Sequence, residues 1–395
     1  MSNGHGEDLS GSIIGTHLIK LGHEVESLPI VGLGKAYSKV GITNIFNLRE
    51  FSTGGLGYTT FYGRITEIFQ GQIFYLFHIL IHLKLVSRRY DFLIIIGDVV
   101  PIIAAWIARR PSFAYLVAYS SHYEGNLKLP WPCLACLKSK CFLRVYSRDK
   151  LTQIHLNKAL INKTDFLGNP FMEPLFNSKL EYFSSIDRLG ILPGSRRPEL
   201  DDNLLLILRG IEVSLYEGLD FKNLSIDFAL VSSYDSSSLN RLAYKFNSQI
   251  NKSSSNPLLQ YFYIKGLRIN IYRNSFATIL KSSDVLLSMS GTAAEQAVGL
   301  SKLVVQLPGR GPQFTPSFAE AQRRLLGPTV FCANGKAGSR ENLLNTFHLI
   351  LTLIKKAKYD RKLILEAQTY ARDRLGGKDG GKLIAKSIDS LIISK

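Results

Sequence analysis

The sequence is poor in cysteine, which argues against a disulfide-dense scaffold and against a zinc-binding domain. Four cysteines among 395 residues are too few for a disulfide-dense scaffold. Cys133 and Cys136 form a CxxC pair, but no second pair completes a zinc set. We therefore expect reduced thiols that act as small apolar residues, and no metal site.

Long apolar runs are lacking as well. The most apolar stretch, Ile73 to Val86, has fourteen residues, whereas a membrane-spanning helix needs about 20. Arg88 and Arg89 follow the run and suit acidic lipid head groups. The run is expected to form either a buried core helix or a helix that lies at a membrane surface, and both interpretations stay open.

Acidic residues are outnumbered, with 31 Asp and Glu against 48 Lys and Arg, a formal charge of +17 and a pI near 9.6. This excess favours an anionic partner such as nucleic acid, acidic lipid or a phosphate-bearing ligand. Zinc-finger spacing and the aromatic motif of RNA-recognition sheets are absent, so no nucleic acid partner is expected. The polar and acidic start, MSNGHGEDLS, predicts no signal peptide.

What the sequence does contain is a regular alternation of apolar strand patterns and helix patterns. This alternation is typical of doubly wound α/β domains with parallel sheets, and the chain is long enough for two such domains. We expect a first domain over residues 1–168, a linker over 169–186, a second domain over 187–358, and closing helices over 359–395.

The first domain begins abnormally. Its Gly-rich turn, Asn3 to Asp8, would ordinarily follow a buried strand, yet only Met1 and Ser2 precede it. Either the start of the chain is assigned too late, which we favour, or the domain tolerates the loss of its first strand. The chain as given is therefore expected to lack that strand.

Three residues of the first domain are candidates for acid or base chemistry. His5 and Asp8 belong to the Gly-rich turn, and Asp98 follows the predicted strand Phe92 to Ile96. Catalytic groups gather at such strand ends in parallel sheets. Alternatively, Asp8 caps a helix and Asp98 is an ordinary turn residue.

The second domain contains a predicted anion site in the stretch Asp284 to Gln296, DVLLSMSGTAAEQ. An apolar strand ends there, and Ser290, Gly291 and Thr292 turn into a helix whose first amides can bind a diphosphate. Glu295 follows within the helix, in reach of a sugar hydroxyl next to that diphosphate. The alternative is an ordinary strand-to-helix turn.

A second turn in the same domain supplies a cation. The predicted strand Leu189 to Leu192 is followed by Gly194, Ser195 and Arg196. A guanidinium at the carboxyl end of a strand can hold phosphate through two hydrogen bonds. Gly194, Ser195 and Arg196 are therefore further candidates for binding the nucleotide.

Five segments resemble lipid-A-disaccharide synthase, and more closely a cyanobacterial group described as related to that synthase. They are LPGSRRPEL (Leu192 to Leu200), DFLGNP (Asp165 to Pro170), SGTAAEQAVGL (Ser290 to Leu300), NGHGEDLSG near the start, and GDVVP (Gly97 to Pro101). The resemblance implies the GT-B architecture, an α/β fold in which two Rossmann-like domains face each other across a cleft.

The same resemblance implies an inverting, metal-independent glycosyltransferase without a cofactor. It would move a sugar from a UDP-sugar, similar to UDP-acylglucosamine, to a lipid acceptor at the acidic inner face of the cytoplasmic membrane. By this resemblance Asp98 is the base. The donor would be held by Arg196, Ser290, Gly291, Thr292 and, at the ribose, Glu295.

The chain departs from the synthase in two places. Apolar sequence replaces a second acidic residue near Asp98, and the segment PGRGPQFTPSFAEAQRRLLG differs from the synthase's loop. His5 is similar to the glycine-histidine loop of the peptidoglycan glucosaminyltransferase. Two alternatives therefore remain, a UDP-sugar epimerase or hydrolase on the same fold and a catalytically degenerate binding protein.

Overall fold

A computed structural model describes residues 1–46, 72–178, 186–254, 256, 259–309 and 315–393. The chain folds into two compact units, unit 1 with Met1–Phe176 and Asp373–Lys395, and unit 2 with Asn177–Arg372. The predicted closing helices over 359–395 are thus divided, because the last segment belongs to unit 1. Among the described helices, none has the length and apolar character needed to cross a membrane.

Unit 1 contains a parallel sheet in the order β3-β4-β5-β6 and a parallel pair, β1-β2. The strands are β1 (Glu26–Ser27), β2 (Thr43–Asn44), β3 (Leu93–Gly97), β4 (Ser112–Leu116), β5 (Phe142–Ser147) and β6 (Thr164–Asp165). The helices are α1 (His5–Lys20), α2 (Lys35–Ser38), α4 (Gln72–Val86), η2 (Ser87–Arg89), α5 (Val99–Ala108), α6 (Ser121–Glu124), α7 (Cys133–Lys138), α8 (Lys150–Leu160), η3 (Pro170–Met172), α9 (Glu173–Asn177) and α17 (Gly380–Ile393).

Two apolar layers cover the two faces of the unit 1 sheet. Ile14 and Leu18 of α1 pack with Ile384 of α17 on the face that includes Ile96. On the opposite face, α4, α5 and α7 pack over Ile95. Because β3 is buried on both sides, its sequence LIIIG reads as a continuous apolar run, as is typical of parallel sheets.

Met1 and Ser2 lie between β3 and the residues that follow β1. Ser2 forms single parallel bridges to Pro29 and to Ile96. The Ile96 N–H donates to the Met1 carbonyl at 2.8 Å, and the Ile30 N–H donates to the Ser2 carbonyl at 2.8 Å. These two residues therefore occupy the place from which a strand would lead into the Gly-rich turn.

Unit 2 is built on an eight-stranded sheet in the order β14-β13-β12-β7-β8-β11-β10-β9. Its strands are β7 (Asp187–Leu192), β8 (Leu224–Leu230), β9 (Asn251–Lys252), β10 (Leu259–Ile264), β11 (Leu267–Arg273), β12 (Val285–Ser288), β13 (Leu303–Gln306) and β14 (Val330–Cys332). All neighbours pair in parallel except at β10, which is antiparallel to β9 and β11.

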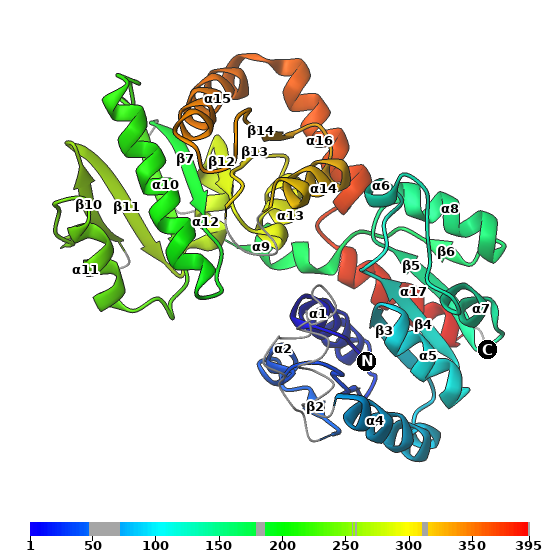
Figure 1. Cartoon of the computed structure of the whole chain (residues 1–395). Coiled ribbons are helices and arrows are strands. Elements are labelled where there is room, and N and C mark those ends of the chain that lie inside the picture. Colours follow the sequence, from blue (N-terminus) through cyan, green and yellow to red (C-terminus); the bar gives the residue numbers. More distant parts are fainter. Residues whose placement is uncertain (47–71, 179–185, 255, 257–258, 310–314, 394–395) are drawn as a thin grey trace. The chain divides into compact units, whose positions relative to one another are not determined.

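Helices cover both faces of the unit 2 sheet (Figure 1). They are α10 (Glu199–Tyr216), α11 (Ser236–Tyr244), α12 (Phe276–Ser282), α13 (Gly291–Gly299), α14 (Pro316–Leu326), α15 (Arg340–Tyr359) and α16 (Arg361–Leu375). From β7 the chain runs to β8, then to the far edge strand β9 and back through β10 to β11 beside β8, and finally crosses to β12 on the other side of β7. The strand order therefore reverses between β7 and β12, as it does in Rossmann folds.

Candidate functional site

Two loops leave the sheet of unit 2 side by side at the point where the strand order reverses. Leu192 of β7 pairs with Ser288 of β12, and the Met289 N–H donates to the Leu192 carbonyl at 2.9 Å. The loops after these strands contain the predicted residues Gly194 to Arg196 and Ser290 to Thr292. In open α/β sheets, ligands bind beyond the carboxyl ends of the strands at such a reversal.

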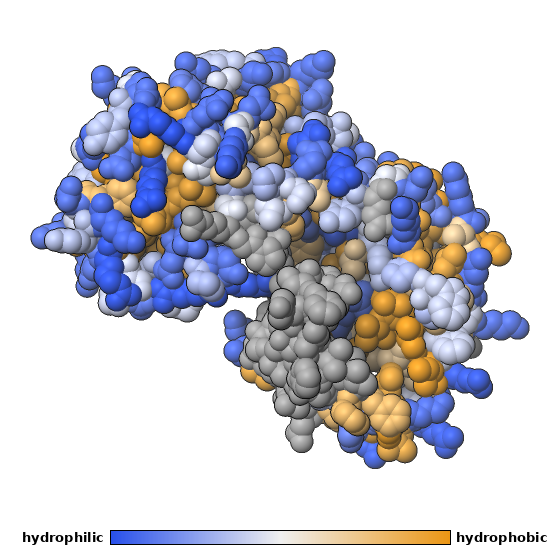
Figure 2. Space-filling model, viewed as in Figure 1, coloured by the Kyte–Doolittle hydropathy of each residue, from blue (hydrophilic) through white to orange (hydrophobic). Residues whose placement is uncertain are grey.

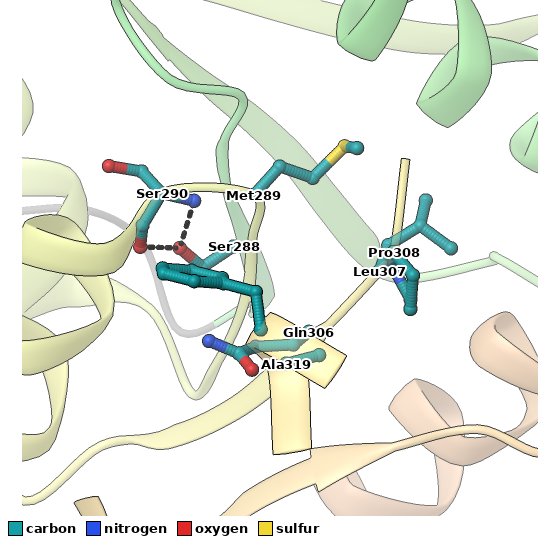
Figure 3. Close-up of a pocket in the computed structure, with 8 residues that line it drawn as sticks. Ser288, Met289, Ser290, Gln306, Leu307, Pro308 and Ala319 are labelled. Atoms are coloured by element: carbon teal, nitrogen blue, oxygen red, sulfur yellow. Dashed lines mark hydrogen bonds between the residues drawn. The ribbon is translucent and has the colours of Figure 1, made fainter. Parts of the chain in front are cut away.

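The N-terminus of α13 has no side-chain cap. Ser290 is the N-cap residue, but its side chain makes no capping hydrogen bond. Its backbone N–H donates to Ser288 Oγ at 3.2 Å, and that hydroxyl donates to the Ser290 carbonyl at 3.0 Å (Figure 3). The first amides of the helix and its positive dipole end are therefore directed away from the strand, toward any anion beyond it.

Close packing explains the glycine in this turn. A Cβ atom on Gly291 would lie 3.3 Å from Phe318 Cζ and 3.5 Å from Gln322 Nε2, both on α14. A larger residue would thus press on these two side chains and require them to shift slightly. Thr292, the next residue, is exposed.

A small pocket beside this turn is lined by residues of β12, β13 and α14, including Ser288, Ser290 and Gln306 (Figure 3). Gln306 and Gln322 are 4% and 6% exposed, and the Oε1 atom of each has no hydrogen-bond partner among the described residues. An unpaired buried carbonyl oxygen costs about 1–3 kcal/mol. The pocket has a volume of about 10 Å³, which is room for about one water molecule that could bond to such an oxygen.

The turn after β7 presents a free cation. Gly194 has a φ of 102°, which favours glycine, and Ser195 and Arg196 are exposed. The next residue, Arg197, is instead paired with Asp201 at 3.2 Å and with Asp235 at 3.0 Å. No ion pair between Arg196 and a described residue is found, so its guanidinium is available to a ligand.

A third loop, after β13, closes against these two. A Cβ atom on Gly309 would lie 2.4 Å from Met289 Cε and 3.1 Å from Asn203 Oδ1, and Asn203 Nδ2 donates to the Pro193 carbonyl at 2.9 Å. This loop belongs to the segment that differs from the synthase's loop, and its residues 310–314 lie outside the described residues. Glu295 is half-buried in the second turn of α13.

In unit 1, Asp98 follows β3 and caps α5. Its Oδ1 accepts from the Val100 N–H at 3.0 Å, and its Oδ2 accepts from Asn3 Nδ2 at 2.8 Å. Burial raises the pKa of Asp98 above its usual value, against the opposing effect of these two hydrogen bonds. The structure thus joins the Gly-rich turn to Asp98.

The other two unit 1 candidates are placed differently. Asp8 lies in the first turns of α1, is 2% exposed and accepts a hydrogen bond from Ser2 Oγ at 2.6 Å. It neither caps α1, since Gly4 holds the N-cap position, nor reaches solvent. His5 begins α1, but its side chain lies outside the described residues.

Sequence reasoning missed a further polar cluster at the ends of β4 and β5. His122 Nε2 lies 3.9 Å from Asp149 Oδ1, and Ser120 Oγ donates to Asp149 Oδ2 at 2.7 Å. Burial and the nearby Arg374 lower the pKa of His122. The only signal in the sequence was that SSHYEG and SRDK each follow a predicted strand.

Comparison with known proteins rests on structure alone. The sequence matches no protein-family model and no curated protein. Its structure is similar to MnaA from S. aureus in a structure with UDP (15% identity, TM-score 0.55, 99% of this chain and 96% of that one). It is also similar to UDP-GlcNAc 2-epimerase from Neisseria meningitidis bound to UDP-GlcNAc (13%, 0.54, 98% of each chain).

The structure is similar to a glycosyltransferase to the same degree, as judged by the TM-score. Spinosyn rhamnosyltransferase SpnG, in a complex with spinosyn aglycone, has 11% identity and a TM-score of 0.55 over 96% of each chain. Identities this low carry information about the fold and not about activity. The chain therefore has the α/β fold of two Rossmann-like domains that GT-B enzymes share.

Proposed function

We propose that this protein is an inverting, metal-independent glycosyltransferase that moves a sugar from a UDP-sugar to a membrane lipid. The observation that carries the proposal is the pair of loops at the strand reversal of unit 2. One loop presents the exposed Arg196, which has no ion pair with a described residue, and the other presents the N-terminus of α13, which has no side-chain cap. Together they supply what a diphosphate requires, which is oriented amides and a guanidinium.

In this proposal each donor-binding residue has a defined task. The amides of Gly291 and Thr292 and the guanidinium of Arg196 hold the diphosphate, and Ser195 and Ser290 add hydroxyl groups. Glu295 accepts a hydrogen bond from the ribose.

Asp98 is the proposed base. It removes the proton from the acceptor hydroxyl while that oxygen attacks the anomeric carbon and the bond from this carbon to UDP breaks. The anomeric configuration is inverted, and the negative charge that leaves with UDP is stabilised by the α13 amides and Arg196. A carboxylate with a raised pKa is a stronger proton acceptor than one in water, which supports the choice of Asp98.

An exposed apolar surface supports a lipid acceptor. Phe74, Phe77 and Leu85 of α4 are 75%, 60% and 72% exposed, and Trp106 of α5 is 45% exposed. Figure 2 shows hydrophobic surface over the part of unit 1 that holds α4 and α5. Exposed Arg88, Arg89 and Arg109 lie next to it in the chain. An apolar face with basic neighbours suits an acidic membrane surface, here the inner face of the cytoplasmic membrane.

The second candidate function is that of a UDP-sugar 2-epimerase. It is favoured by the likeness to epimerase structures that contain UDP or UDP-GlcNAc, and the His122–Asp149 pair offers a second acid/base group. This candidate uses the same nucleotide site but needs no lipid. A catalytically inactive binding protein is the remaining alternative.

One experiment separates the three. Purified protein is incubated with a panel of UDP-sugars, with and without a membrane lipid extract, and the products are analysed by mass spectrometry and sugar chromatography. A new glycolipid formed only with the lipid extract, unchanged by EDTA, is the proposed outcome. An epimeric UDP-sugar formed without lipid would favour the epimerase, and unchanged UDP-sugars in every reaction would favour a binding protein.

Flotation tests the membrane part separately. Vesicles of phosphatidylglycerol are expected to carry the protein to the top of a gradient, whereas phosphatidylcholine vesicles carry less. The double variant Phe74→Ser with Phe77→Ser should lose this binding. The control is Tyr244→Ser with Tyr359→Ser, which removes from unit 2 two aromatic side chains that are more exposed than Phe74 and Phe77. Equal flotation of both double variants would contradict the proposed surface.

A further inference from the structure

Unit 1 contains a cavity of about 600 Å³ between β1 and β3. The backbone segments 24–28 and 90–94 form its two sides. Ile14 and Leu18 of α1 line one of its faces, and Leu83 of α4 lines the other. These residues belong to two separate apolar layers on opposite faces of β3. The cavity is thus a slot in the plane of the sheet, with apolar residues above and below it, and charged residues such as Glu24, Arg89 and Asp91 also line it.

One end of the slot is already filled by a short stretch of parallel strand. Ser2 bridges to Ile96 on one side and to Pro29 on the other. The Met1 amine donates to the Ile94 carbonyl at 2.7 Å, as the N–H of an interior strand residue would. The slot continues from Met1 toward the start of β3, in the direction from which a preceding residue would enter.

On both edges of the slot, the backbone N–H and C=O groups of every second residue face inward, as they do next to a paired strand. On β3, the Ile94 carbonyl and the Ile96 N–H form hydrogen bonds with the backbone of Met1. The Leu93 N–H points to the other side of the strand, where it donates to the Pro111 carbonyl. Since successive residues of a strand alternate in this direction, Phe92 also faces the slot. On the opposite edge, Leu28 and Ile30 bond to Ser2, so that Glu26 faces the slot by the same alternation.

We propose that this slot binds one further parallel β-strand, an apolar run of about five residues that precedes Met1 in a longer form of the chain. The strand joins the β1-β2 pair to the β3-β6 sheet, giving the order β2-β1-slot-β3-β4-β5-β6. Because both walls are apolar, the occupant is apolar at every position rather than at alternate ones. This proposal is independent of the proposed function.

The register follows from the bridges of Ser2. The residue immediately before Met1 lies beside Ile94 and Ser27, and the residue two places earlier lies beside Phe92 and Val25. The side chain directly before Met1 therefore lies on the same face as that of Ile94 and on the opposite face from that of Leu93.

Extension of the full-length chain tests the proposal. One variant carries Ile-Val-Leu-Val-Ile before Met1, and the control carries Ile-Asn-Leu-Asn-Ile, which has the same length and alternates. The apolar extension is expected to raise the Tm by about 5 °C or more relative to the chain as given, and to slow hydrogen exchange at segments 26–28 and 92–96 at least tenfold. Equal Tm and exchange with both extensions would overturn the proposal. Aggregation of the apolar variant alone would also overturn it, because a strand outside the slot exposes its apolar side chains.

Disulfide trapping tests the register. A cysteine placed directly before Met1, within the apolar extension, is combined with Ile94→Cys or with the matched control Leu93→Cys. The Ile94→Cys pair is expected to oxidise to an intramolecular disulfide, identified by peptide mapping, at least tenfold more efficiently than the Leu93→Cys pair. Equal yields, or no disulfide in either, would contradict the proposed strand.

Discussion

Asn3 Nδ2 donates a 2.8 Å hydrogen bond to Asp98 Oδ2, although the two residues are 95 positions apart in the chain. This bond connects the turn that follows Met1 and Ser2 to the end of β3. A Cβ atom on Gly97 would lie 3.3 Å from Asn3 Cβ, so the two turns also pack closely. Asp98 is therefore held in one orientation by a neighbour from the Gly-rich turn.

The first prediction concerns Asp98. Asp98→Asn keeps the size of the side chain but removes the proton acceptor, so we expect turnover to fall at least 100-fold while the Kd for UDP is unchanged. Steady-state rates and calorimetric titration with UDP measure the two effects. Retained turnover would shift the role of base to His5 or to His122.

The pH profile gives a second prediction for the same group. The base must be ionised, and burial raises the pKa of Asp98, so kcat/KM should fall as the pH drops, with a midpoint above the ordinary value of 3.8. The Asn3 hydrogen bond lowers that pKa. Asn3→Ala should therefore move the acid limb to higher pH, whereas Asn251→Ala, at an exposed position of unit 2, should not. An unmoved limb in Asn3→Ala would show that another group controls it.

The two neighbouring arginines provide a matched pair for the donor site. Arg196→Ala should weaken UDP binding roughly 10- to 100-fold, the loss expected when a charged hydrogen-bonding group is removed. Arg197→Ala should change it little, because this guanidinium is already paired with Asp201 and Asp235. Glu295→Ala should weaken binding less than Arg196→Ala does. The assignment fails if Arg197→Ala is the more damaging variant.

A substitution of Gln322 can show whether its buried amide binds the ligand or has only a structural role. Its Oε1 is buried without a partner in the described part of the chain, so Gln322→Met should raise the Tm by a few degrees and at the same time weaken UDP binding. Thr329 also has a buried hydroxyl without a partner among the described residues, but it precedes β14 and so lies at the amino end of that strand, away from the carboxyl ends that hold the candidate site. Thr329→Val should raise the Tm and leave UDP binding intact. Parallel effects of the two variants on UDP binding would contradict a role for Gln322.

The buried amine of Met1 predicts a pH dependence of stability. Burial lowers its pKa from 8.0 to about 5, so the folded state binds this proton less readily than the unfolded state does. The stabilisation is complete above pH 8 and is lost as the pH falls through 5. The urea midpoint of the free-amine chain should thus fall, relative to an N-acetylated chain, between pH 8 and pH 5. A constant difference would mean that the amine stays charged in the fold.

Much of the sheet architecture could be predicted from the sequence, because parallel strands buried on both faces are continuous apolar runs. The patterns at Leu189 to Leu192 and after Asp284 correspond to β7 and β12. The strand β11 was missed, because its sequence LRINIYR is interrupted by polar residues. One of them, Asn270, is buried and donates to Asp227 at 2.8 Å, and a pairing so distant in sequence leaves no local pattern.

Pairings distant in sequence also limited the prediction of the site. The sequence placed the glycine turns at strand ends, but it did not show that Asp235 pairs with Arg197, whereas Arg196 forms no ion pair with any described residue. Nor did it show that α17 packs on α1. An amphipathic pattern predicts which face of a helix is buried, but not which element covers that face. The catalytic and binding roles themselves stay predictions.

Hydrogen exchange with and without UDP tests the central claim most directly, because it locates the nucleotide on the chain. We predict that saturating UDP slows exchange at the amides of residues 194–197 and 290–293, and that Arg196→Ala removes this protection at the same UDP concentration. Protection elsewhere with none in these two loops, or no protection anywhere at millimolar UDP, would contradict the claim that the strand reversal of unit 2 binds the diphosphate.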